Sequence, residues 1–385
     1  NAPSDVKPDV RDALRVSTYE IIFLGKTPHA AVDQGVELVR SFAMSASGLA
    51  NAVLRKIVLM RQAFPFGDPM RDPEALARLH ALPLVVGAQA HRRLGAAGGS
   101  RLHARLERAG AAVHRRQRGE NLRRGPGQSV RQAGRGAGPV SVDGVSVAGC
   151  YRVLDTRALL LPEVKRMFSQ GKILVTDAAS QLVAASVLPE RKPASLLEVG
   201  AGRATKTILL QSNACRKYGS QIEEYVTIDN HAYKTRLLEK RAEQYGVVVT
   251  EAFTGNALEL DNIMPDRMFS FIFVDAPCSG MGTLRRHPEI RWRTSEEDLA
   301  GFVETQLGML KAAAGHVAPG GALAYSTCTV TREENAGVVK AFLESEEGAG
   351  FTLDQLCGRN CLATRLAPGS SDAHFAVRFV RKPQE

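Results

Sequence analysis

The stretch FIFVDAPCSGMG, residues 271–282, indicates how this chain folds. Its four leading apolar residues run directly into Asp275 and Cys278, a pattern typical of a buried strand that ends at a loop carrying reactive side chains. A second apolar run, GGALAYSTCT over residues 320–329, ends in the same way at Cys328. Because ligands bind at the carboxyl ends of the strands in an open α/β sheet, we expect these three side chains to face one site.

These two runs belong to a longer regular pattern. Between residues 195 and 329, strand-like runs alternate with helix-length segments in the order SLLEVGAGRATKTILLQ, YVTIDNHAYKTRLLEKRAEQYG, VVVTEAFTGNALEL, FSFIFVDAPCSG and GGALAYSTCT. Such alternation predicts a parallel sheet with helices on both faces, so we expect an α/β protein with a Rossmann-like, doubly wound sheet. Upstream, residues 172–188 predict a strand, a helix cap at Asp177 and a helix. Downstream, residues 370–382 predict a last strand, in which His374 packs rather than catalyses.

Composition narrows the class of protein. A chain of 385 residues has room for two or three domains, and 44% hydrophobic and 23% charged residues are ordinary for a soluble globular protein. No run of 18 apolar residues is present, so we predict no membrane partner. The six cysteines contain no CxxC pair, which argues against zinc fingers and a disulfide framework, and we predict no metal site. The chain begins at Asn1 without a signal peptide, so we expect a cytoplasmic protein whose sequence starts partway into its gene product.

The net charge of +10 comes from one segment. Residues 91–135 hold twelve arginines and two glutamates, and the rest of the chain is formally neutral. The segment lacks aromatic residues and cannot bury enough apolar surface to offset the entropy of ordering it. It is interpreted as a disordered basic arm for RNA, as a solvated linker, or as a region read out of frame after a one-base insertion near Leu84 and Val85, with the frame recovered near Gly138. We favour the third interpretation, because a one-base shift of the back-translated segment restores aromatic and acidic residues.

The first part of the chain predicts helices. Over residues 10–65 apolar residues recur at spacings of three and four, which is typical of three amphipathic helices. The phrases PHAAVDQGVELVR (28–40) and ANAVLRKI (50–57) resemble the NusB-like RNA-binding domain in front of some ribosomal RNA methyltransferases. The resemblance implies a small all-α, RNA-binding domain over residues 1–66. The alternative is a helical packing domain without a role in RNA binding.

The turn after the first strand-like run of the sheet indicates a nucleoside ligand. Gly200 and Gly202 let the backbone approach a ligand closely, and Asp229 closes the next run, where a carboxylate can bind the two hydroxyls of a ribose. The sequence has no GxxxxGK[ST] phosphate-binding loop, which favours an adenosine without a polyphosphate. S-adenosylmethionine fits that description better than NAD or ATP. The alternative role for Asp229 is that of a cap at the strand end.

Two thiols and an aspartate suit the methylation of a pyrimidine ring. Carbon 5 of the ring is barely nucleophilic, but addition of a thiolate to carbon 6 makes it an enamine-like nucleophile. The adduct needs an acid group at N3, and Asp275 lies in the same loop as one of the thiols. After methyl transfer the carbon 5 proton must leave and the thiol must be expelled. That last step gives a second thiol or an activated water a role.

Three motifs, EVGAGRATKT, DAPCSG and STCT, together resemble the RsmB (Fmu/Sun) family of RNA cytosine-5 methyltransferases. The resemblance implies that Cys328 attacks the base and that Cys278 assists release of the product. It further implies that Asp275 contacts the cytosine and that Lys206 lies by the reacting centre. DNA cytosine methyltransferases take their nucleophile from the Pro-Cys position instead, so the presence of both cysteines favours the RNA family. The alternative is that both cysteines are buried structural residues.

The same resemblance implies where S-adenosylmethionine binds. The first motif of the family is close to D-x-C-A-A-P-G-G-K-T, whereas this chain has Glu198 in place of the aspartate and lacks the proline and both glycines. Lys234 replaces an arginine usual after the ribose aspartate, and Asn256 replaces an aspartate expected near the adenine. The expected cofactor-binding residues are Glu198, Gly200, Ala201, Gly202, Lys206, Asp229, Lys234, Asn256 and Asp275.

The sequence thus predicts an S-adenosylmethionine-dependent RNA cytosine-5 methyltransferase, with small-subunit ribosomal RNA as the expected substrate. We expect a helical NusB-like domain over residues 1–66, a linker region over 67–139 and a methyltransferase domain over 140–385. The segment RRHPEIRWR (285–293) combines arginines with the only tryptophan and is expected to form a lid that contacts RNA. Two alternatives stay open: transfer RNA as the substrate, and an RNA-binding assembly factor without turnover.

Overall fold

The computed structural model describes residues 5–68, 71–72, 74–75, 137–153, 156–366 and 371–383. These residues form two compact units, one on each side of residues 76–136. The arginine-rich segment lies outside the described residues, and with it the predictions of a basic arm, a linker or an out-of-frame region.

The first unit is a bundle of three helices, α1 (Pro8–Ile22), α2 (Pro28–Phe42) and α3 (Ser47–Met60). Both α1 and α2 start at a proline, whose missing N–H has no partner at that position of a helix in any case. Gly35 of α2 lies where the helices approach one another closely, since a Cβ there would lie 2.7 Å from the Leu54 side chain. The prediction of a small all-helical domain is confirmed.

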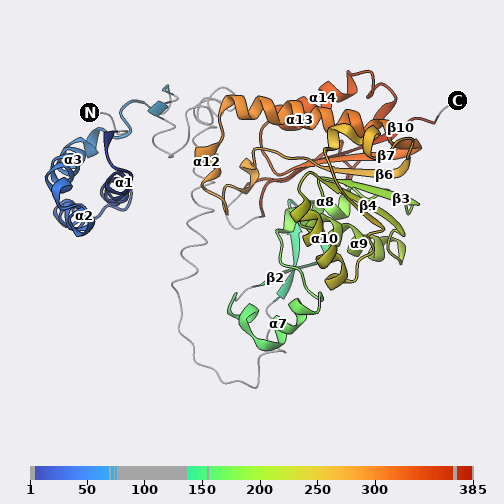
Figure 1. Cartoon of the computed structure of the whole chain (residues 1–385), viewed down its shortest axis with the longest axis horizontal. Helices are drawn as coiled ribbons and strands as arrows, with labels where there is room; N and C mark the ends of the chain where they lie inside the picture. Colours follow the sequence, from blue (N-terminus) through green and yellow to red (C-terminus); the bar gives the residue numbers. More distant parts are fainter. Residues whose placement is uncertain are drawn as a thin grey trace. The chain divides into compact units, whose positions relative to one another are not determined.

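The second unit is built on a mixed sheet with the strand order β5-β4-β3-β6-β7-β10-β8 (Figure 1). Its strands are β3 (Ser195–Val199), β4 (Glu224–Asp229), β5 (Glu251–Thr254), β6 (Phe269–Asp275), β7 (Val317–Thr327), β8 (Phe351–Asp354) and β10 (Phe375–Arg381), and the short β9 (Leu362–Ala363) pairs with β10. The first five strands of this order are parallel. The predicted last strand, β10, is antiparallel and lies between β7 and β8. The predicted Rossmann-like α/β class is confirmed.

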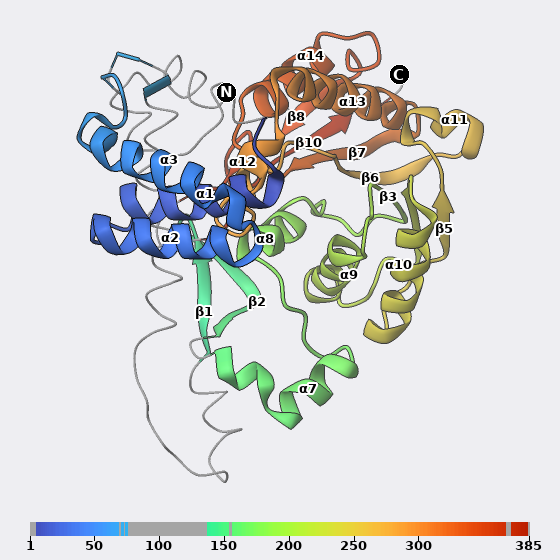
Figure 2. The same cartoon turned by 60° about the vertical axis from the view of Figure 1, so that its left-hand side comes forward.

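Helices cover both faces of this sheet (Figures 1 and 2). One face carries α8 (Ala178–Ser186), α9 (Thr205–Tyr218) and α10 (Ala232–Tyr245), and the other carries α13 (Glu296–Gly315) and α14 (Val338–Leu343). In the described part of the chain, none of the helices has both the length and the apolar character needed to cross a membrane.

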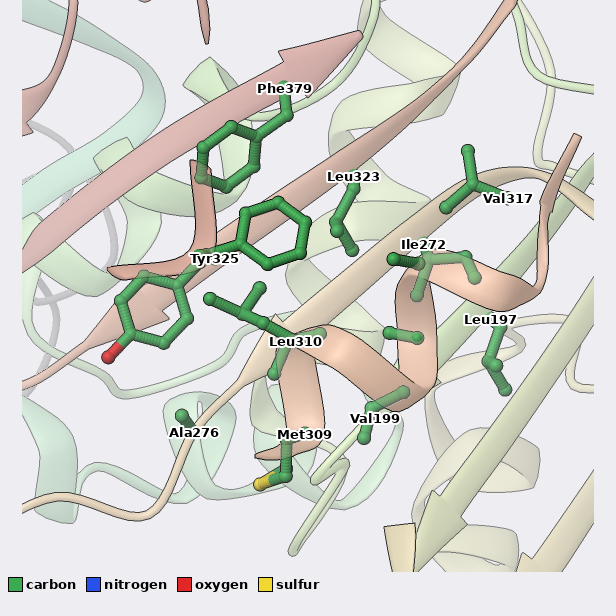
Figure 3. Close-up of a cluster of buried hydrophobic side chains, with 14 of the residues drawn as sticks. Leu197, Val199, Ile272, Ala276, Met309, Leu310, Val317, Leu323, Tyr325 and Phe379 are labelled. Atoms are coloured by element: carbon green, nitrogen blue, oxygen red, sulfur yellow. The ribbon is translucent and has the colours of Figure 1, made fainter. Parts of the chain in front are cut away.

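Strand β6 shows why its sequence is apolar throughout. Ile272 and Val274 pack on the side of α13, while Phe271 and Phe273 pack on the side of α8 and α9. Successive side chains of a strand point to opposite faces, so a strand buried on both sides needs a continuous apolar run rather than an alternating one. Figure 3 shows the α13 side, where Leu310 lies among side chains of the sheet.

Upstream of the sheet, β1 (Ala137–Val142) and β2 (Val145–Val153) form an antiparallel hairpin that packs against α8. The predicted strand over residues 172–176 is wrong, because this segment has no regular structure. Leu174 packs against the apolar clusters around α9 without joining a ladder, so the apolar residues there reflect packing alone. The predicted helix cap is confirmed, since the Asp177 carboxylate accepts a hydrogen bond from the N–H of Ala179 at 2.9 Å.

Arg378 ties β10 to the end of α8. Its side chain is only 5% exposed. The guanidinium donates to the carbonyls of Val187 and Leu188 at 3.3 and 2.8 Å and to the carboxylate of Asp354 at 2.8 Å. The carbonyls at and just beyond the end of a helix have no partner within it, and Arg378 supplies donors to them, with Lys217 donating to Leu188 as well.

We predict that Arg378→Met lowers the free energy of unfolding by about 2–4 kcal/mol, because methionine keeps the apolar stem but removes the only charged partner of the Asp354 carboxylate in the described structure and the donor to the buried Val187 carbonyl. Urea unfolding followed by circular dichroism measures the change. Lys382→Met is the matched control, since this exposed residue lies just beyond the same strand. Equal unfolding free energies for the two variants would contradict the prediction.

Candidate active site

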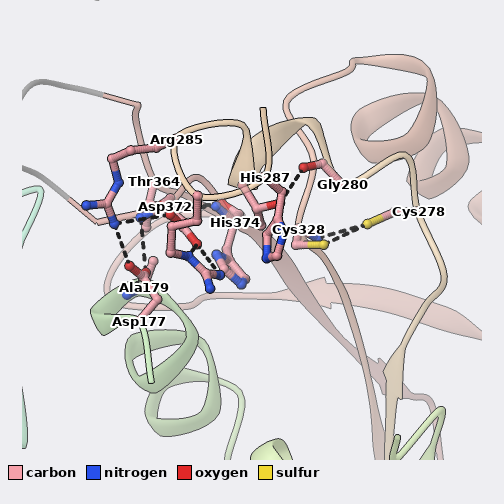
Figure 4. Close-up of polar contacts among 12 residues, drawn as sticks. Asp177, Ala179, Cys278, Gly280, Arg285, His287, Cys328, Thr364, Asp372 and His374 are labelled. Atoms are coloured by element: carbon pink, nitrogen blue, oxygen red, sulfur yellow. Dashed lines mark hydrogen bonds and ion pairs between the residues drawn. The ribbon is translucent and has the colours of Figure 1, made fainter. Parts of the chain in front are cut away.

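Cys278 and Cys328 lie side by side at the carboxyl ends of β6 and β7 (Figure 4). Their sulfur atoms are 3.1 Å apart, and the backbone N–H of Cys328 donates to the Cys278 sulfur at 3.2 Å. Both are free thiols. The pairing of the two strands explains this proximity. Asp275 lies opposite Ser326 in the register, so β6 and β7 end at the same level of the sheet.

Asp275 is held between Lys206 and Ser326. The Lys206 Nζ lies 3.1 and 3.2 Å from the two carboxylate oxygens, and the Ser326 hydroxyl donates to one of them at 2.6 Å. The side chain of Lys206 is 7% exposed and that of Asp275 is 30% exposed, so the carboxylate is anchored on its inner side and open on the other. Three elements, α9, β6 and β7, thus fix one carboxylate close to the thiols.

The contact between the sulfur atoms separates the two thiols chemically. This contact lowers the pKa of Cys328, because the Cys278 thiol donates a hydrogen bond to the Cys328 sulfur. The charge of Lys206 lowers this pKa further, whereas burial and the carboxylates of Asp275 and Glu334 raise it. The same contact, followed by burial, raises the pKa of Cys278 well above its usual value. The thiolate is the nucleophilic form of cysteine. This arrangement therefore ionises Cys328 first and keeps a proton on Cys278.

The turn between β3 and α9 meets the end of β4. Gly200 has φ of +79°, and a Cβ there would collide with the carbonyl oxygen of Asp275. The N–H of Gly202 donates to one oxygen of Asp229 at 3.0 Å, and the Lys234 Nζ lies 3.2 Å from the other. The Asp229 carboxylate also accepts a hydrogen bond from the backbone N–H of His231 at 3.0 Å, which caps the end of its own strand. A left-handed glycine turn beside a strand-end carboxylate fits the ribose of the expected cofactor.

Three other residues expected at the cofactor have local partners. Glu198 is completely buried and accepts hydrogen bonds from the hydroxyls of Thr207 and Tyr225 at 2.6 and 2.8 Å. Burial raises the pKa of Glu198 to about 7. Its contacts hold α9 and β4 against β3 beneath the glycine turn. Ala201 packs in the apolar cluster under the turn, and the exposed Asn256 caps the short helix that follows β5.

A buried ion cluster fixes the segment of residues 285–293 (Figure 4). Asp372 is completely buried and pairs with Arg285 at 3.2 Å and with Arg286 at 2.7 Å. Arg285 also reaches Asp177, the cap of α8, at 3.2 Å. The sequence did not indicate this cluster, because paired arginines in a basic loop are equally typical of a solvated segment. Only the fold brings the two aspartates to them.

Two residues near this cluster differ in exposure. His374 is buried at the start of β10, and burial lowers the pKa of its ring to about 4, so the imidazole is neutral. Trp292, in the short helix α12 (Ile290–Arg293), is 64% exposed. Within the described ranges, no group of three or more His, Cys, Asp or Glu side chains is arranged to hold a metal ion.

Glu334 is another residue of the site that the sequence did not indicate. It is completely buried, and it hydrogen-bonds to the residues that follow both cysteines. Its neighbour Glu333 is the same residue type in the same charged stretch, so no spacing or motif distinguishes the two glutamates.

The chain is similar to known proteins over both of its units. A family model described as 16S rRNA methyltransferase RsmB/F matches residues 185–370, and a NusB family model matches residues 3–59. The probable ribosomal RNA small subunit methyltransferase B of Bacillus subtilis is 30% identical over 355 residues, which cover 89% of this chain and 74% of that protein. The ribosomal RNA small subunit methyltransferase B of Thermus thermophilus is 30% identical over 341 residues, covering 89% and 71%.

A solved structure has a similar fold. The methyltransferase homolog protein from Pyrococcus horikoshii superposes with a TM-score of 0.59 at 17% identity, covering 82% of this chain and 99% of that one. The sequence relatives and the family model go further than this likeness of fold. They show that the chain belongs to the RsmB/F family of 16S rRNA methyltransferases, and that it is an S-adenosylmethionine-dependent RNA (cytosine-5) methyltransferase.

Proposed function

We propose that this enzyme methylates a cytosine of small-subunit ribosomal RNA through a covalent bond between Cys328 and carbon 6 of the base. The observation that carries the mechanism is the pair of thiols 3.1 Å apart whose pKa values shift in opposite directions. The names of the relatives from Bacillus subtilis and Thermus thermophilus support ribosomal RNA as the substrate.

The reaction begins at the Cys328 thiolate. Its sulfur bonds to carbon 6, and the electrons of the C5–C6 double bond move through carbon 4 onto N3. The Lys206 ammonium, whose Nζ lies 3.1 Å from a carboxylate oxygen of Asp275, is the donor of this pair and supplies the proton that stabilises the charge at N3, directly or through Asp275. Carbon 5 is then the nucleophile of an enamine. S-adenosylmethionine, when bound, supplies an electrophilic methyl group, and Gly200, Gly202 and Asp229 would hold it.

Release of the product gives Cys278 its role. While Cys328 is a thiolate, the contact between the sulfurs raises the pKa of Cys278. In the adduct the Cys328 sulfur is a neutral thioether, so the largest cause of the raised pKa is removed and the thiolate form of Cys278 becomes more accessible. The Cys278 thiolate then accepts the carbon 5 proton. The C6–S bond breaks, the double bond re-forms, and the electron pair returns to Cys328.

We assign residues 1–66 to a NusB-like RNA-binding domain, residues 67–139 to a linker region and residues 140–385 to the methyltransferase domain. The NusB match over residues 3–59 and the three-helix bundle support the first assignment. The sheet and its thiols support the third. The target cytosine must leave its stack to reach a sulfur at the sheet edge, because carbon 6 is not accessible in a stacked base.

The segment of residues 285–293 contributes to RNA binding in this proposal. Arg286 is half-exposed, and its guanidinium is oriented by two hydrogen-bonding nitrogens on the buried Asp372. It also lies close enough to Cys328 to interact electrostatically with it. A guanidinium held at this place suits a phosphate next to the target base, and the exposed ring of Trp292 suits a neighbouring base.

Cys328→Ala is expected to reduce methyl transfer by roughly a thousandfold or more, because the attacking atom is removed. Transfer of tritium from labelled S-adenosylmethionine to small-subunit ribosomal RNA measures the loss. Cys215→Ala, an exposed cysteine of α9, serves as the control with unchanged activity. Retained transfer by the Cys328 variant would rule out this nucleophile, and transfer to transfer RNA alone would replace the proposed substrate.

Cys278→Ala is expected to accumulate a covalent protein–RNA adduct, since attack by Cys328 proceeds and elimination stalls. A denaturing gel with labelled RNA shows the adduct as a band of reduced mobility. The double variant with Cys328→Ala should show no such band. Free product at normal turnover from the single variant would contradict the role of Cys278.

Arg286→Gln is expected to weaken RNA binding. The slope of log Kd against the logarithm of the salt concentration should fall by about one, which corresponds to the loss of one phosphate contact. Arg285 still pairs with Asp372, and the glutamine amide can donate to it, so the buried carboxylate keeps a charged partner. Arg236→Gln on α10 is the matched control, because it is an exposed arginine outside this cluster. The same salt slope for both variants and the unaltered enzyme would exclude a phosphate contact at Arg286.

A further inference from the structure

A single buried carboxylate joins the two cysteine loops. Glu334 is completely buried. It accepts hydrogen bonds from the backbone N–H and the hydroxyl of Ser279, at 2.8 and 2.6 Å, and from the hydroxyl of Thr329 at 3.1 Å. Ser279 directly follows Cys278, and Thr329 directly follows Cys328. One side chain therefore contacts the residue next to each thiol.

Two further donors complete the shell of Glu334. The hydroxyl of Thr331 donates at 2.6 Å, and the Gln306 amide donates at 3.1 Å to Glu334 and at 2.8 Å to the carbonyl of Pro277. The backbone of Glu334 is fixed as well, because the Tyr325 hydroxyl donates to its carbonyl at 2.6 Å. Glu334 lies in the π-helical turn η7 (Glu333–Gly337), a kind of turn that is frequent at functional sites.

We propose that Glu334 is a positioning residue, which sets the separation and relative orientation of the sulfur atoms of Cys278 and Cys328. This inference rests on the proposed two-thiol mechanism. The loops that carry the sulfurs also contact each other directly, through the hydroxyls of Ser279 and Thr329, 2.8 Å apart, and through the N–H of Gly282, which donates to the Cys328 carbonyl at 2.9 Å. Glu334 is the buried charged group that accepts hydrogen bonds from both loops. A carboxylate suits the task because its two oxygens can accept about four hydrogen bonds and donate none.

The distribution of donors explains why glutamine cannot replace Glu334. One carboxylate oxygen accepts from two N–H groups, those of Ser279 and Gln306, and the other accepts from three hydroxyls, those of Ser279, Thr329 and Thr331. An amide has one accepting oxygen and one NH₂ group. Either orientation leaves some of these donors facing another donor, so the loops must move.

Glu334 also acts on the thiols through its charge. Its carboxylate raises the pKa of both Cys278 and Cys328. The other charged groups that act on the Cys328 thiol are Lys206, Asp275 and Arg286. This charge acts on Cys328 less than the contact between the sulfurs does, so a variant that displaces the loops raises the pH at which the nucleophile ionises.

The test compares Glu334→Gln, Glu334→Asp and the exposed control Glu346→Gln in the full chain. We expect Glu334→Gln to lower kcat by about tenfold to a hundredfold, as misplacement of reacting groups does, with KM for RNA little changed. Its pH–rate profile should shift to higher pH, because displaced loops weaken the contact between the sulfurs that lowers the pKa of Cys328. Glu334→Asp should recover part of the rate and part of this shift, and Glu346→Gln should match the unaltered enzyme.

Equilibrium binding of S-adenosylmethionine by each variant reports whether its sheet is folded. If Glu334→Gln fails to fold, Ser279→Ala and Thr329→Val remove one donor from each loop and should each lower kcat without changing KM. An unaltered rate and pH profile in the folded variants would overturn the role of Glu334. Failure of the Cys278→Ala protein to form a covalent adduct would instead overturn the two-thiol mechanism, so the two failures are distinguishable.

Discussion

The parallel pairing of β6 with β7 is the constraint on which the active site depends. This pairing places Asp275 opposite Ser326, so the two strands end at the same level of the sheet. The sulfurs of Cys278 and Cys328, 50 residues apart in the chain, then lie 3.1 Å apart without a covalent link. Burial on both faces keeps the strands in register, because a slip of one residue would move every side chain to the opposite face.

Hydrogen bonds from neighbouring elements refine the geometry that the strand pairing sets. Asp275 is oriented by Ser326 of the next strand and by Lys206 of α9. Glu334 receives donors from the loops after both strands and from α13. These groups are largely shielded from water. In such a low-dielectric interior, hydrogen bonds are electrostatically stronger and an unpaired polar group is more costly than in water. A reacting group placed in this way is therefore held in one position before the substrate arrives.

The local features of the fold could be predicted from the sequence. Apolar runs, glycine turns and the cap at Asp177 depend on residues within a few positions of one another, and the structure has the five parallel strands in the predicted segments. The strand expected over residues 172–176 is absent, because its apolar residues pack without a ladder. The short strand β8 and the antiparallel position of β10 beside it were not predicted, since strand order depends on contacts between distant segments.

By itself, the sequence determined the fold class and the family resemblance and predicted the reactive side chains, because each of these depends on residue type and short spacing. Only the tertiary structure decided how those side chains behave. The opposite pKa shifts of Cys278 and Cys328 exist because their sulfurs touch. Glu334 differs from Glu333 because two loops converge on it, and Asp372 becomes an anchor because two arginines 86 and 87 residues away fold onto it. Electrostatic and hydrogen-bond energies depend on distances in space, and distances between remote segments exist only after the chain has folded.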